Sequence, residues 1–338
     1  MADISQSNQD FLNNVLQKLH GNLEVKFKKF VDDQIRAIEE TKVKIKKRKG
    51  VIHFMRIFPQ FSAAVENMLS AVDYNLGVRR MVDHEYDRIL RSMFDSLKVI
   101  ARENPGVGAV GAAGVNSADP EDKEALNFHI LLIENMNHYL EEVENQRGLE
   151  VLDEWREAAQ RELSEHIGLY LNTVMRRPLG KLLEYLENIE AQLAGGKSPA
   201  GIAAQPSNSK QTFNKILGGY DAKEVRKGIE SLKKRVEKHF GDDDGKDFIP
   251  AMPGSSSLSV SSGVSGHLSG HLSGSVKSGG GANMGLVVKV LRECEKFYGE
   301  VEMRIGKVTT DVYGGDVLFE WPRAEVKGAF ALGHLGGR

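Results

Sequence analysis

The chain has 338 residues, 27% charged and 41% hydrophobic, a composition typical of a water-soluble protein that buries a sizeable core. Its formal net charge of −2 predicts no overall field that recruits nucleic acid, and its single cysteine excludes an intrachain disulfide or a thiolate metal cluster. The N-terminus lacks a signal-peptide pattern and no run of about 18 apolar residues occurs, so we expect a cytosolic protein without a bilayer span.

The first predicted element is a long amphipathic helix near the N-terminus. Its apolar residues recur every three or four positions, at Phe11, Val15, Leu19, Phe27, Phe30, Val31, Ile35, Ile38 and Ile45. We expect an interruption at Gly21. Gly50 is predicted to end the helix, because glycine readily takes the left-handed conformation that closes a helix and cations favour its carbonyl end.

The last turns of this helix form a basic segment, residues 42–49. Six of its eight residues are cationic: Lys42, Lys44, Lys46, Lys47, Arg48 and Lys49. Pro59 opposes simple continuation of the helix, so the basic segment is predicted to form an exposed corner between two helices. Apolar residues from Val51 to Phe61 follow it. Exposed cations beside apolar residues predict a contact with a partner protein or with anionic lipid.

The strength of such a contact depends on which cations share a face. Near an anionic leaflet each lysine or arginine contributes about 1 kcal/mol. On a helix Lys42, Lys46 and Lys49 lie together, whereas Lys44 and Arg48 point away, so about half of the segment acts together. A solvated helix end and a site for an acidic protein are the open alternatives. Nucleic acid is not an expected partner, because no aromatic stacking platform accompanies the cations.

After the basic segment the sequence predicts a series of further helices. Apolar stripes run over residues 61–72, 81–100, 126–143, 149–174, 179–193, 225–240 and 286–308, with a short turn at 213–217. Asp221 and Glu224 form a capping pair before the stripe that ends at Phe240. No segment alternates apolar and polar residues convincingly, so no substantial β-sheet is expected. The predicted fold is all-α, an elongated stack of antiparallel helical bundles, because helices about 40 Å long must lie side by side.

The same pattern divides the chain. We expect residues 1–104 to form a first helical bundle that carries the basic segment, and residues 121–240 to form a second. Between and after them, residues 105–120 are predicted to be a flexible glycine-rich loop and residues 241–282 a disordered Ser/Gly linker. Residues 283–338 are predicted to be a C-terminal helix and a tail that packs back on the bundle.

Motifs that carry chemistry are weak in this sequence. Gly106, Gly108 and Gly111 match the letters of a dinucleotide-binding motif, but a helical pattern precedes them where that motif requires a buried strand. His267 and His271 lie in Ser/Gly-rich surroundings that do not hold a helix. No catalytic pair or metal-ligand set occurs in a suitable context. We therefore predict no enzymatic activity, no cofactor and no metal.

Three segments carry a resemblance to a known family. They are EETKVKIKKRKGVIHFMRIFPQF from Glu39, RRPLGKLLEYLENIEAQL from Arg176 and YDAKEVRKGIESLKKRVEKHF from Tyr220. They resemble, in order, the C-terminal region of the exocyst subunit Sec-three in its filamentous-fungal form, and the similarity runs from about Phe11 to Phe330. The resemblance implies a helical rod of the tethering-complex class and a non-enzymatic role.

The resemblance also implies a place of action and a set of partners. Its family holds secretory vesicles at the plasma membrane before fusion, so the expected location is cytoplasmic, peripherally associated with the plasma membrane at secretion sites. The expected partners are other exocyst subunits. Family binding of phosphoinositides and Rho-type GTPases lies in an N-terminal domain absent from this sequence, so Rho-type GTPase binding is not expected. The alternative is a self-sufficient peripheral membrane protein that binds anionic phospholipid through the basic segment.

Overall fold

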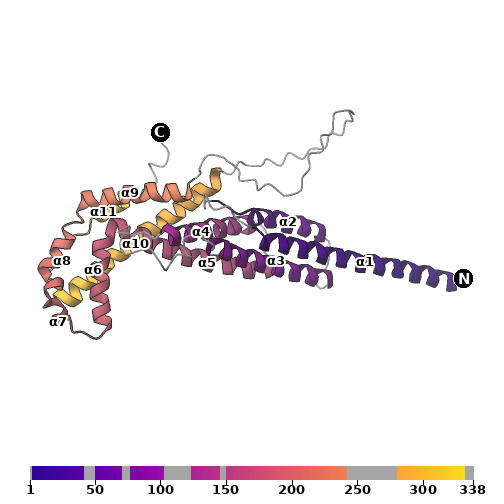
Figure 1. Cartoon of the computed structure of the whole chain (residues 1–338), viewed down its shortest axis with the longest axis horizontal. Helices are drawn as coiled ribbons and strands as arrows, with labels where there is room; N and C mark the ends of the chain where they lie inside the picture. The colour runs from indigo at the N-terminus through magenta and orange to yellow at the C-terminus, as the bar shows by residue number, and fades with distance from the viewer. Residues whose placement is uncertain are drawn as a thin grey trace, which may run out of the picture.

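A computed structural model of the chain describes residues 2–41, 50–70, 77–102, 123–144, 150–241 and 280–331. Across these ranges all regular secondary structure is helical, which confirms the predicted all-α fold. The helices are α1 (Ala2–Glu39), α2 (His53–Leu69), α3 (Gly77–Arg102), α4 (Lys123–Val143), α5 (Glu150–Val174), α6 (Arg176–Ala194), α7 (Pro199–Ala203), α8 (Lys210–Leu217), α9 (Ala222–Phe240), α10 (Gly280–Tyr313) and α11 (Arg323–Phe330), with a 3-10 turn η3 (Pro206–Asn208) before α8. The molecule is elongated, and the N-terminal part of α1 projects from one end (Figure 1).

Helices α1 to α5 lie side by side along the long axis of the molecule (Figure 1). Helix α4 packs most extensively on α5, α1 lies on α3, and α2 and α3 both contact α4. The α3 sequence explains this packing, because Tyr86, Leu90, Met93 and Leu97 recur every three or four residues and are all fully buried. A stripe of this kind holds α3 lengthwise against its neighbours, whereas the central helix α4 is buried on most sides from Ile130 to Asn137.

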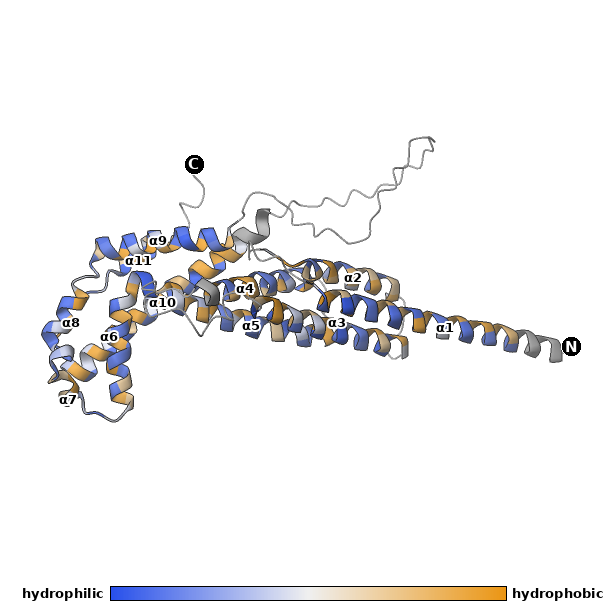
Figure 2. Ribbon diagram, viewed as in Figure 1, coloured by the Kyte–Doolittle hydropathy of each residue, from blue (hydrophilic) through white to orange (hydrophobic). Residues whose placement is uncertain are grey.

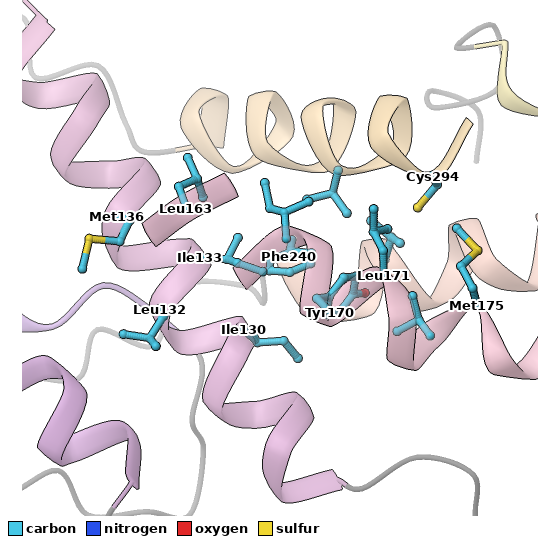
Figure 3. Close-up of a cluster of buried hydrophobic side chains, with 14 of the residues drawn as sticks. Ile130, Leu132, Ile133, Met136, Leu163, Tyr170, Leu171, Met175, Phe240 and Cys294 are labelled. Atoms are coloured by element: carbon cyan, nitrogen blue, oxygen red, sulfur yellow. The ribbon is translucent and has the colours of Figure 1, made fainter. Parts of the chain in front are cut away.

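Helices α6 to α11 form the other end of the molecule around α10. Helix α10 contacts α4 and α5 on one side and α6, α7, α9 and α11 on the other. Figure 3 shows a buried cluster at this junction, where Tyr170 and Leu171 of α5 lie near Phe240 and Cys294. The core is therefore continuous from the α1–α5 rods into the α6–α11 end.

Aromatic side chains pack the C-terminal segment against α10. The ring centroids of Trp321 and Phe330 lie 6.2 Å and 5.6 Å from that of Tyr298 in α10. At the far end of α10, Tyr313 shares a 2.6 Å hydrogen bond with the hydroxyl of Tyr185 in α6. The predicted division of the chain into two bundles, a loop, a linker and a C-terminal unit stays a prediction.

A buried ion network links α2 to α3. The Arg79 side chain is 5% exposed, and its Nη1 donates to Glu66 Oε2 at 2.6 Å while its Nε donates to Asp83 Oδ1 at 2.9 Å. The Tyr86 hydroxyl donates to the other Glu66 oxygen at 3.0 Å. Because every partner is hydrogen-bonded, the charge of Arg79 is tolerated inside the packed pair of helices.

Two local predictions for the N-terminal helices were wrong, and Pro59 lies within a helix. Helix α1 passes through Gly21 without a break, and it ends at Glu39 rather than at the end of the basic segment. Pro59 lies inside α2, where it is buried and its carbonyl accepts a 3.0 Å hydrogen bond from Ser62 Oγ. Core packing around Pro59 outweighs the missing backbone donor, which sequence rules treat as a helix stop.

Candidate docking surface

The basic segment, with the predicted contact residues Lys42, Lys44, Lys46, Lys47, Arg48 and Lys49, lies outside the described residues. The structure describes what comes immediately before and after it. Before it, Thr41 follows the end of α1, and its hydroxyl donates to the Ala37 carbonyl at 2.8 Å. After it, Gly50 has a φ of 108°, which glycine tolerates and other residues resist.

Two buried polar residues of α4 hold the backbone that follows the basic segment. Glu134 Oε2 accepts from the Gly50 amide at 2.7 Å, and Asn135 Oδ1 accepts from the Ile52 amide at 2.8 Å. The Asn135 amide group also donates to the carbonyls of Leu131 and Gly50, at 2.8 Å and 3.4 Å. Since Asn135 is fully buried, these bonds fix the backbone of residues 50–52 onto α4.

The projecting part of α1 carries exposed apolar side chains. Every described side chain from Gln9 to Leu23 is exposed. The apolar ones in this stretch are Phe11 (71% exposed), Leu12 (55%), Val15 (38%), Leu16 (53%), Leu19 (53%) and Leu23 (66%), and we call these six residues the α1 stripe. The same end of α1 reaches beyond α2 and α3, and Figure 2 shows hydrophobic positions along it.

The leucines of the α1 stripe share one face. Leu12, Leu16, Leu19 and Leu23 follow one another at intervals of four, three and four residues, which places them within about 60° around a helix of 3.6 residues per turn. Intervals of three and four residues are typical of helices that pack lengthwise against another helix.

The part of α1 that follows the α1 stripe is packed within the molecule. Toward the C-terminal end of α1, Val31 and Ile38 are buried and α1 lies on α3. The Phe30 ring lies 5.9 Å from that of Phe61 in α2, and Asp32 of α1 pairs with Arg88 of α3 at 2.6 Å. At 3.6 residues per turn Val31 and Ile38 lie about 70–90° around α1 from the leucines of the α1 stripe, and Phe30 lies in line with those leucines. Helix α1 is thus covered by its own chain toward one end and open at the other.

An open apolar face of this size has a large potential for association. Burying one leucine or phenylalanine side chain contributes about 1.5–3 kcal/mol relative to leaving it in water. The α1 stripe has six apolar side chains, so a helix laid along it would gain several times that amount before the cost of association. The sequence pattern placed Phe11, Val15 and Leu19 on one helix face but did not reveal that this face is uncovered.

The described residues offer little for catalysis. An open groove of about 530 Å³ lies between α1 and α3, and its described lining contains no histidine and no cysteine. Cys294 is fully buried, and burial raises the pKa of its thiol to about 12, so it is unreactive at neutral pH. Among the described residues no group of three or more His, Cys, Asp or Glu side chains is suited to hold a metal ion.

Two histidines meet between α4 and α5. The Nδ1 atoms of His129 and His166 are 3.0 Å apart, and Glu162 lies 3.3 Å from the other ring nitrogen of His166. Partial burial, with a further contribution from His166, lowers the pKa of His129 to about 4. Burial also lowers the pKa of His166, against the opposing effect of Glu162. Both imidazoles therefore stay neutral at pH 7.

This pair predicts a loss of stability in mild acid. Unfolded histidines take up a proton near pH 6.5, whereas folded His129 does so only near pH 4, so stability falls as the pH drops through this window. We expect His129 to account for about 1–2 kcal/mol of the loss between pH 7 and pH 5, measured from urea midpoints. His129→Gln should flatten the pH dependence, and exposed His53→Gln should not. Equal slopes in both variants would contradict this assignment.

None of the described helices combines the length and hydropathy that crossing a membrane requires.

Comparisons with known proteins identify what this chain is similar to. The family model described as exocyst complex component Sec3, C-terminal, matches residues 1–315. Exocyst complex component 1 of Mus musculus is 25% identical over 230 residues, which cover 68% of this chain and 23% of the mouse protein. The protein of the same name from Drosophila melanogaster is 22% identical over 240 residues, covering 71% of this chain and 24% of its own length.

A third relative, exocyst complex component 1 of Dictyostelium discoideum, is 24% identical over 230 residues, covering 68% of this chain and 24% of that protein. The chain therefore spans about a quarter of the length of the curated relatives it matches. No solved structure matches it.

Proposed function

The chain belongs to the family of the C-terminal part of exocyst complex component Sec3, and from this premise we propose that it is a non-enzymatic rod that docks other exocyst subunits through its helix faces. The face that supports docking best is the α1 stripe. Its apolar side chains are exposed, follow helical spacing and belong to a helix whose C-terminal part is already packed on α3 and α2. The occupant proposed is an amphipathic helix of another exocyst subunit.

The elongated all-helical architecture agrees with this role. A rod presents long faces along which another helix can lie, and the described residues hold no catalytic or metal-binding group that competes as an explanation. The relatives bear the name of an exocyst component, which points to exocyst subunits as the proteins docked. The proposed place of action is the cytoplasmic side of the plasma membrane, in vesicle tethering during exocytosis.

Polar substitution within the α1 stripe tests this proposal. Leu16→Gln, Leu19→Gln and Leu23→Gln together should leave the urea midpoint unchanged, because these side chains are exposed and glutamine keeps helix propensity. Affinity purification of the tagged chain should recover exocyst subunits, identified by mass spectrometry, at least about tenfold less efficiently from the triple variant.

The matched control changes three exposed apolar residues elsewhere. Val99, Leu169 and Met303 are 50%, 40% and 68% exposed, and their replacement by glutamine should leave recovery of the exocyst subunits unchanged. Recovery that is equal for the two triple variants would show that the α1 stripe is not the docking face.

The basic segment is proposed as a second contact. The bonds from Gly50 and Ile52 to α4 hold the backbone that directly follows the basic segment on the rod. Reversal of Lys46, Lys47 and Arg48 to glutamate should leave thermal stability nearly unchanged and weaken capture of partner or membrane. A collapse of the fold would show that the basic segment is structural instead.

Vesicle sedimentation separates the two readings of the basic segment. Salt-sensitive binding of this chain to phosphoinositide-containing vesicles, lost on reversal of Lys46, Lys47 and Arg48, favours the alternative of a self-sufficient peripheral membrane protein. Loss of exocyst subunits without any loss of vesicle binding favours docking.

A further inference from the structure

Helix α9 has one buried side and one cationic side. Its buried residues are Val225, Ile229, Leu232, Val236 and Phe240. On the opposite side four exposed lysines, Lys223, Lys227, Lys234 and Lys238, form what we call the α9 lysine stripe. At 3.6 residues per turn they fall within about 60° around the helix, and at 1.5 Å per residue they span about 22 Å.

Contacts with three neighbouring helices fix the rotation of α9. Lys233 Nζ donates to the Ala329 carbonyl of α11 at 2.9 Å, and Gly228 lies close against Pro178 of α6, where an added Cβ would come within 3.2 Å of the proline Cβ. His239 shares a 2.9 Å hydrogen bond with the Tyr170 hydroxyl of α5. The α9 lysine stripe is therefore held on the exposed side of α9, and Figure 2 shows that hydrophilic positions alternate with hydrophobic ones along this helix.

Most charges of the stripe are not neutralised locally. Within the described part of the chain, no carboxylate lies within 4.0 Å of Lys223, Lys234 or Lys238. Lys227 lies 3.9 Å from Glu224, but this ion pair is exposed to solvent and therefore contributes little energy. Glu230, which flanks the stripe, is paired at 3.2 Å with Arg226.

The amino-acid composition of the exposed side of α9 favours a membrane over a protein as its partner. Protein interfaces are enriched in aromatic residues and arginine and depleted of lysine, and α9 exposes no large apolar side chain. A bilayer surface instead attracts point charges, and each lysine near an anionic leaflet raises binding about fivefold. A straight, convex row of lysines fits a flat surface better than it fits a groove.

We propose that the α9 lysine stripe lies against an anionic phospholipid bilayer. This contact is independent of the α1 stripe and of the basic segment, and it lies at the other end of the rod from the projecting part of α1 (Figure 1). It gives the rod a side that faces the membrane while the α1 stripe remains open to a helix.

The test uses the full 338-residue chain and sedimentation with phosphatidylcholine vesicles that contain or lack phosphatidylserine. The wild-type chain should bind the anionic vesicles only, and more weakly as salt rises. Replacing Lys223, Lys227, Lys234 and Lys238 by glutamine should reduce the partition coefficient on the order of 100-fold. This is less than the product of four fivefold factors, because glutamates beside the stripe repel the anionic surface. The urea midpoint should not change, because all four lysines are exposed.

A matched control removes the same charge from scattered positions. Lys18, Lys181, Lys197 and Lys307 are exposed and lie on other elements, and their replacement by glutamine should reduce binding far less. If both variants lost vesicle binding equally, the net charge of the chain would explain the effect, and the proposal would be overturned. It would also be overturned if wild-type binding were absent or if the α9 variant bound normally. Retained vesicle binding with lost exocyst subunits would assign the stripe to a protein.

Discussion

Replacement of Phe240 by alanine is expected to lower the free energy of unfolding by about 3–5 kcal/mol. Phe240 is the last residue of α9 and is fully buried, and its ring stands edge-on to Tyr170 of α5 at a centroid distance of 5.1 Å. Figure 3 shows it in the cluster that joins α9 to α4 and α5. Truncation leaves a cavity at this junction, which close-packed helices fill only in part.

Urea denaturation followed by circular dichroism measures this effect. Phe11→Ala is the matched control, since the Phe11 side chain is 71% exposed and its loss should change the midpoint by less than about 0.5 kcal/mol. A Phe240→Ala variant as stable as the control would mean that α9 does not depend on this junction.

Asn135→Ala should cost about 2–4 kcal/mol, because it orphans a buried backbone amide. The Ile52 amide donates to Asn135 Oδ1, and Ile52 is itself only 8% exposed, so water cannot replace the lost acceptor. The substitution also removes the donors to Leu131 and Gly50. We therefore expect the chain between α1 and α2 to detach from α4, with faster amide hydrogen exchange at Ile52.

Asn137 of the same helix provides the control. It is also buried, at 7% exposure, but its amide bonds only to Glu141 on its own helix, at 3.0 Å. Asn137→Ala should cost about 1 kcal/mol or less. If the two alanine variants unfold at the same urea concentration, the Gly50–Ile52 anchor contributes nothing to stability.

Sequence patterns predicted α9 in detail. Asp221 and Glu224 were expected to cap it, and Asp221 Oδ1 accepts from the Glu224 amide at 2.8 Å. Its inward residues were predicted from spacing, and Val225, Ile229 and Val236 are buried among them. Capping and amphipathic spacing are local, so the residues that determine them can be read along the chain.

Features that depend on distant segments were not predictable. The spacing of Leu19 and Leu23 is the same whether their face is covered or open, because coverage is decided by other helices. Pro59 was expected to oppose continuation of the first helix, but it lies inside α2, where it is buried. The hydrogen bond between Asn135 and Ile52 joins residues 83 positions apart, and no local sequence pattern predicts it. The predicted contact role of the basic segment stays a prediction.

Helix α10 determines how the rod responds to force. Its 34 residues extend about 50 Å as one uninterrupted helix that touches α4 and α5 as well as α6 and α7. Helix α10 and the contacts of Tyr170 with α9 share any tension between the two ends of the molecule, and bending at the junction requires backbone hydrogen bonds of α10 to break. A rod built this way passes a pull along its length instead of absorbing it in a hinge.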